Sequence, residues 1–212
     1  MTQHRATSGF SAISQVESYW EALRGTRVMP KRAEIDPRGI EHAREHTFVL
    51  ERVGIGMARL RIAGSHLSNL MGMEVRGMPI TSFIAPEDRT QVRDLLEDVF
   101  QRPSTCELHL SGVVDRDRPP MEARMLLLPM KSDLGDVSRV LGCMVARGDQ
   151  GRLPRRFNIV NTHMRSLFSE GETPQDTDQV KETIAPLGFD EPRSKFTTKP
   201  RTPYLRLVNT DD

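Results

Sequence analysis

The alternation of apolar and polar residues predicts two groups of strands along the chain. Residues 47–53 alternate with a period of two, and residues 54–56 carry two glycines that suit a hairpin turn. The partner strand follows, with Ala58, Leu60 and Ile62 predicted to face inward. Three further alternating runs occupy about 105–112, 121–128 and 140–146. Such alternation is typical of an antiparallel sheet with one solvent-exposed face and one buried face.

The residues between the two groups of strands have apolar side chains at helical spacing. Ser65 can cap a short helix that ends at Met71, because Gly72 suits the left-handed position after a helix. Pro86 opens a longer helix whose apolar residues recur at intervals of three and four until Pro103. The order is therefore strand, strand, helices, strand, strand, strand, which defines an α+β fold.

A further helix is predicted at Ser11–Arg24, where Gly25 ends it. Its apolar residues fall at spacings of three and four, and two turns of this pattern are too short for a stable isolated coiled coil. The helix must pack on the domain's own sheet or on a second copy of the chain. We expect self-association through this stripe, which consists of Ile13, Val16, Trp20 and Leu23.

The composition changes after Gly148, where six prolines are spread over the rest of the chain. We expect most of residues 148–212, and residues 1–9, to be disordered. Residues 157–168 have apolar side chains at helical spacing, and residues 204–208 are strand-like. The predicted helix could bind a partner through Val160 and Leu167, or it could cap the domain's own sheet.

Charge and cysteine content narrow the classes of function. The 30 Lys and Arg residues nearly balance 29 Asp and Glu residues, so no overall field favours nucleic acid. The chain has no apolar run of membrane-spanning length and no secretory signal pattern, which predicts a soluble cytoplasmic protein. Cys106 and Cys143 fall on strands that a third strand should separate, which is too far for a disulfide.

Two passages carry a resemblance to a known family. The segment Arg61-Ile62-Ala63-Gly64-Ser65-His66-Leu67, followed by Met71-Gly72-Met73-Glu74-Val75-Arg76-Gly77, resembles the start of the helical section of PAS domains. Together with residues 19–25 and 30–37, it is similar to a family of stand-alone bacterial PAS proteins common in alphaproteobacteria. The resemblance covers about residues 10–147. It implies a five-stranded antiparallel sheet with helices over one face.

The resemblance also implies a signalling domain with a small apolar cavity. Met71, Met73 and Met125 would lie around that cavity unless they are ordinary core residues, and His66 would lie at its edge. Haem-binding relatives commonly use a histidine on or near the long helix, and residues 87–102 contain none. Photoactive flavin relatives use a cysteine in the helical section, which also has none here. The ligand, if there is one, stays unknown.

Other candidate sites have ordinary explanations. His42 and His46 are four residues apart but have no obvious third metal ligand. The basic group Arg24, Arg27, Lys31 and Arg32 is expected to be solvated, with an acidic partner or an anionic nucleotide as the alternative.

The sequence therefore predicts a non-enzymatic PAS adaptor or regulator. It would act through another signalling protein, such as a histidine kinase or its regulator, and would form a homodimer. A small-molecule sensor is the alternative. An enzyme is disfavoured because no nucleophile and base, and no paired carboxylates, are evident.

Overall fold

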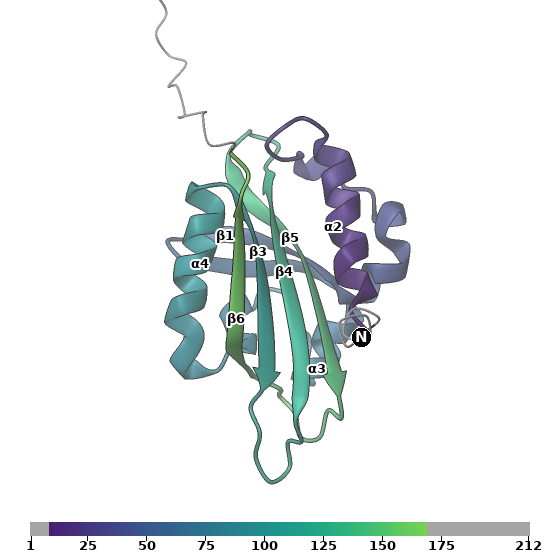
Figure 1. Ribbon diagram of the computed structural model, residues 1–212, viewed down its shortest axis with the longest axis vertical. Coiled ribbons are helices and arrows are strands. Elements are labelled where there is room, and N and C mark those ends of the chain that lie inside the picture. The colour runs from purple at the N-terminus through teal and green to yellow at the C-terminus, as the bar shows by residue number, and fades with distance from the viewer. Residues whose placement is uncertain (1–8, 169–212) are drawn as a thin grey trace, which may run out of the picture. The chain divides into compact units, whose positions relative to one another are not determined.

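The computed structural model describes residues 9–168, and one six-stranded sheet organises them (Figure 1). Neighbouring strands are antiparallel, in the order β2-β1-β5-β4-β3-β6. The first five strands lie where the alternation predicted them, and they confirm the PAS order of elements. The strands are β1 Thr47–Gly54, β2 Met57–Ala63, β3 Ser104–Gly112, β4 Met121–Lys131, β5 Val137–Gly148 and β6 Phe157–Ser166.

One face of the sheet, here called the inner face, is covered by the helical section between β2 and β3. This section comprises α3 Ser65–Met71, η3 Ile80–Phe83, η4 Pro86–Asp88 and α4 Arg89–Gln101. α3 ends as predicted, with Gly72 in the left-handed conformation and its N–H donating to the Ser68 carbonyl at 2.8 Å. The buried residues of α4 include Val92, Leu96 and Val99, which confirms the predicted helical periodicity.

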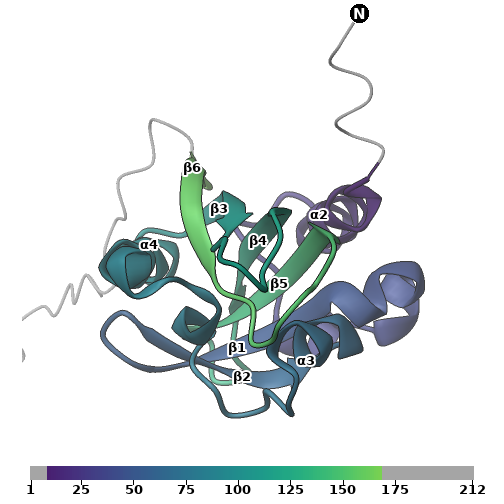
Figure 2. The ribbon, with the colours of Figure 1, turned by 90° about the horizontal axis from the view of Figure 1, so that it is seen from below.

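The opposite, outer face is also covered by helices (Figure 2). α2 (Ser11–Arg24) packs on β4 and β5, beside the short 3-10 segments η1 Arg32–Glu34 and η2 Pro37–His46. The reason lies in β4, where Leu126, Leu127 and Leu128 are buried in succession, so this strand is apolar on both faces. The prediction of helices over one face alone was therefore incomplete.

β6 corrects the interpretation of residues 157–168. We predicted a helix, but Phe157–Ser166 is a strand that pairs with β3 along its length. Phe157, Ile159 and Met164 pack against the inner core. A register shift between Ile159 and Asn161 inserts Val160 as an extra residue, and this break in the period of two imitates helical spacing.

The folded unit consequently extends beyond the predicted limit at Arg147. Residues 148–168 belong to it, so the prediction of disorder was wrong for this part of the tail. The segment caps the domain's own sheet, which was one of the two alternatives. The strand predicted at 204–208 and the N-terminal residues 1–8 lie outside the described residues.

Both edge strands are partly shielded from pairing with other chains. At the β2 edge, the Leu60 N–H donates to the Met78 carbonyl at 2.9 Å, and Gly77 donates to the Leu60 carbonyl at 2.7 Å. At the β6 edge, the Ile159 N–H donates to the Asp88 carboxylate at 2.8 Å. Such covering is a usual protection of exposed sheet edges against aggregation.

The crossover between β5 and β6 is fixed by Arg155, whose side chain is fully buried. Its guanidinium donates to the carbonyls of Gln150 and Pro119, each at 2.8 Å, and its backbone N–H donates to the Leu70 carbonyl at 2.8 Å. One residue thus joins the crossover, the β3–β4 turn and α3. No carboxylate within residues 9–168 forms an ion pair with it.

Replacing Arg155 by Met should lower the free energy of unfolding by about 2 kcal/mol, because two partly buried carbonyls lose their donors. Urea unfolding measures the change. The adjacent Arg156, which is exposed, provides the matched control, and Arg156→Met should stay within about 0.5 kcal/mol of the parent chain. Equal stability of the two variants would contradict the anchoring role.

Candidate functional site

The residues predicted to surround a cavity do not share one environment. Met71 and Met125 are buried in the inner core, where they pack as ordinary apolar residues. Met73 is 54% exposed beyond the end of α3, so its assignment to a cavity was wrong. His66 is half-buried on α3. The sulfur-bearing side chains therefore do not converge on one binding site.

An aromatic ring fills the centre of the inner face. Phe48 of β1 is fully buried opposite Gly142 of β5. A Cβ atom at position 142 would lie 2.2 Å from the Phe48 ring, so the ring occupies the space that a side chain would take. Gly142 is thus required by close packing, and this part of the sheet is closed by protein atoms.

His66 has a structural role at the end of β5. The pairing of β1 with β5 stops at Thr47 and Cys143, and beyond that point the Ala146 N–H donates to Nε2 of His66 at 3.0 Å. Burial, with a smaller contribution from the nearby His46, lowers the pKa of His66 from 6.5 to about 4. The neutral ring thus replaces a missing strand partner.

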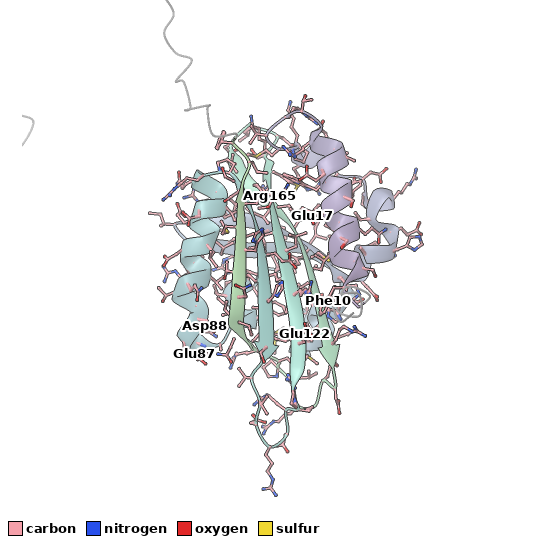
Figure 3. All side chains as sticks on the ribbon, in the orientation of Figure 1. Phe10, Glu17, Glu87, Asp88, Glu122 and Arg165 are labelled. Carbon is pink, nitrogen blue, oxygen red and sulfur yellow. The ribbon has the colours of Figure 1, made fainter. Side chains whose placement is uncertain are left out.

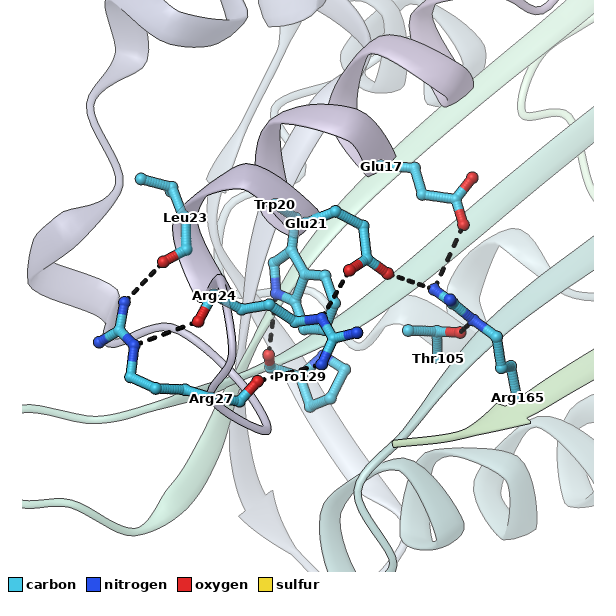
Figure 4. A network of polar contacts seen from close by, with 9 residues as sticks. All are labelled: Glu17, Trp20, Glu21, Leu23, Arg24, Arg27, Thr105, Pro129 and Arg165. Carbon is cyan, nitrogen blue, oxygen red and sulfur yellow. Dashed lines mark hydrogen bonds and ion pairs between the residues drawn. The ribbon is translucent and has the colours of Figure 1, made fainter. Parts of the chain in front are cut away.

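The apolar stripe of α2 faces the protein's own sheet. Ile13, Val16 and Trp20 are buried in the outer core, and the Trp20 indole N–H donates to the Pro129 carbonyl at 3.1 Å (Figure 4). These three side chains are not available to a second copy, which corrects the expectation of self-association through them. The fourth member, Leu23, is half-buried.

An ionic network joins α2 to β6. The Arg165 guanidinium lies 2.5 Å from the Glu21 carboxylate and 3.6 Å from Glu17, and Arg24 also contacts Glu21 at 2.5 Å (Figures 3 and 4). Partial burial opposes ionisation of Glu21, but hydrogen bonds from Arg24 and Arg165 outweigh it and lower the pKa of this carboxyl. α2 and β6 are therefore coupled on the outer face.

The predicted partner residues of the tail differ in exposure. Leu167 packs partly on the outer core and borders a hollow of about 330 Å³ together with Arg24, Arg27 and Val28. Val160 is 68% exposed, and as the extra residue of the β6 bulge it has no partner in the pairing with β3. Bulges commonly redirect a side chain, and here the bulge accompanies an exposed apolar residue.

The two cysteines are unreactive core residues. Cys106 lies in the inner core and Cys143 in the outer core, and β4 separates their strands, as predicted. Burial raises the pKa of both thiols to about 12, with a smaller contribution from Glu107 at Cys106. A thiol of this kind is a poor nucleophile.

Two negative findings apply to residues 9–168. No three His, Cys, Asp or Glu side chains in this range are grouped so that they could hold a metal ion, and His42 is simply exposed. None of the helices described is both long and apolar enough to cross a membrane.

The model of a PAS domain family matches residues 9–145. No curated protein matches the chain. Similar solved structures include a PAS domain from Colwellia psychrerythraea, at 14% identity and a TM-score of 0.37, covering 54% of this chain and 98% of that one.

Two further similar structures come from photoreceptor and kinase proteins. The light-state LOV domain of Aureochrome1 is 12% identical with a TM-score of 0.39, covering 53% of this chain and 88% of that one. A sensory box histidine kinase/response regulator from Burkholderia thailandensis E264 is 18% identical with a TM-score of 0.34, covering 52% and 84%.

The environment of His66 predicts a dependence of stability on pH. Because the pKa of His66 is about 4 in the folded chain and about 6.5 when unfolded, the unfolded state binds the proton first as the pH falls. Stability should therefore decrease between about pH 6.5 and about pH 4. His66→Gln keeps a hydrogen-bond acceptor without a titrating group, so its stability should fall less over this range.

Urea unfolding of the parent and of His66→Gln at about pH 7 and about pH 5 measures the difference in their pH dependence. The carboxylates contribute equally to the pH dependence of the two proteins, so they do not affect this difference. His42→Gln is the control, because His42 is exposed, and it should keep the parent pH dependence. The structural role of a neutral His66 would be refuted by identical pH dependence in His66→Gln and the parent.

Proposed function

Because the chain belongs to the PAS domain family, whose fold serves sensing and signalling, we propose that it is a non-enzymatic adaptor or regulator that binds another protein. The observation that carries this proposal is Val160, an exposed β-branched side chain at a bulge of the outermost strand. The polar network of Arg165 with α2 lies on the same strand. An exposed apolar residue and a polar network on one strand can together contribute to a small recognition surface.

The partner is proposed to bind the outer side of β6, from Val160 to Leu167. Leu167 and Leu23 are only half-buried and can contribute apolar area near the end of α2. Leu23, Val160 and Leu167 are the three residues of the predicted interface that are not fully buried in the protein's own cores. Another signalling protein, with a histidine kinase or its regulator as the first class to test, is the proposed partner.

An interior ligand is not needed for this function. Phe48, Met71 and Met125 fill the inner core, and neither thiol is accessible for chemistry. We therefore favour signalling through the surface over gating by a ligand in the inner core.

Replacing Val160 by Glu should abolish capture of the partner without changing stability, because the side chain is already in solvent. The full chain is used as bait in lysate of the cells that express it, and captured proteins are quantified by mass spectrometry. Ile55→Glu and Leu134→Glu are matched controls, since Ile55 is 80% and Leu134 is 95% exposed, each in a turn outside β6. A protein lost with Val160→Glu alone identifies a candidate partner.

The proposal fails if all three variants retain the same captured proteins. A second copy of the chain is the competing occupant of this surface. Sedimentation would then show a dimer of the parent chain that Val160→Glu dissociates and the two control variants preserve.

A further inference from the structure

The outer face has a groove beside β1 and β2 that lies away from the β6 surface. Its main part has a volume of about 580 Å³ between η2 and the two strands. A second hollow of about 550 Å³ shares Arg32, Val49 and Ile62 with it. Volumes of this size are typical of small-molecule sites.

The apolar floor of the groove results from an irregular register. β1 and β2 slip between Val49 and Leu50, so Leu60 pairs with Leu50 but Ile62 pairs with Val49. Leu50 and Leu60 belong to the inner core, whereas Val49 belongs to the outer core. Ile62 was predicted to face inward, but it lies in the outer groove and is 49% exposed.

Neighbouring residues extend this apolar area. Ile40 and Leu141 are buried beneath the groove, and Ile35 lies half-buried at its side. α2 packs over β4 and β5 and is not among the groove's lining elements. A hydrophobic ligand would therefore cover Ile62 and Ile35 without displacing a helix.

The rim of the groove carries two guanidinium groups that have no partner within the described part of the chain. Arg32 and Arg44 line it, and neither side chain makes an ion pair or hydrogen bond with any residue from 9 to 168. Arg27, in contrast, is bound to Glu34 at 3.0 Å. The structure thus leaves two cations beside an apolar floor.

The acidic groups nearby do not form ion pairs with Arg32 or Arg44. Glu45 lies 3.2 Å from His46, and Glu51 is held between Arg61 and Arg139. Asp133 borders only the second hollow. The main hollow is therefore bordered by two arginines and one carboxylate, which favours an anionic ligand.

We propose that this groove binds an amphipathic carboxylate with an unbranched alkyl chain, such as a medium-chain fatty acid. The alkyl chain would lie on Val49, Ile62 and Ile35, where it removes exposed apolar surface from water. The carboxylate would accept hydrogen bonds from Arg32 and Arg44, because the guanidinium fork matches carboxylate geometry. This proposal does not depend on the partner surface at β6.

Decanoate is the probe, and isothermal titration to the full chain measures its affinity. The double variant Arg32→Gln and Arg44→Gln should weaken binding by at least about tenfold. Arg76→Gln with Arg116→Gln removes the same charge from exposed sites outside the groove and should leave the affinity unchanged. Val160→Glu should also bind decanoate like the parent, which separates this test from that of the partner surface.

A second measurement locates the ligand. Titration with decanoate should shift the backbone amide resonances of Val49 and Ile62 but not those of inner-core residues such as Met125. Decanol, which lacks the charge, should bind at least about tenfold more weakly than decanoate.

Three outcomes would overturn the proposal. They are no binding of decanoate, equal binding by the Arg32 and Arg44 double variant, or resonance shifts confined to the inner core. The chain could instead dimerise in a concentration-dependent way, with no binding of decanoate. If Ile62→Asp abolished that dimer, the groove would be assigned to a second copy of the chain.

Discussion

The structure depends on a sheet whose central strands are apolar on both faces. β4 places Leu127 in the inner core and Leu126 and Leu128 in the outer core, so water must be excluded from both sides. The helical section covers one side, and α2 with Trp20 covers the other. Burial of apolar surface on both sides is the main favourable term of such a fold. The N-terminal helix is therefore an integral layer of the domain.

This constraint also separates what the sequence could predict from what it could not. Clear periodicity located α2, α4 and the first five strands, because most of each pattern matched one secondary structure. β6 and β2 each contain an irregularity of one residue, at Val160 and near Arg61. A slip of one residue reverses the face of every later side chain, so the helix prediction and the inward placement of Ile62 both failed for the same reason.

The candidate sites were harder to predict than the elements. An apolar helical stripe has the same pattern whether it packs on its own sheet or on another chain, so Trp20 was assigned to the wrong surface. Contacts between distant residues give no local signal. Arg165 meets Glu21 across 144 positions, and Arg155 binds the carbonyl of Pro119 in another loop. Only the three-dimensional arrangement shows that these arginines hold the chain together.

The position of β6 has a consequence for how the protein is made. Phe157 completes the inner core, and Arg165 reaches back to α2 near the other end of the described chain. During synthesis, α2 leaves the ribosome long before β6 does. Contacts of such long sequence separation slow folding, because a long loop must close before they form. The inner face of the nascent sheet therefore stays unfinished until β6 emerges, and during that interval the nascent chain exposes apolar surface that a chaperone can bind.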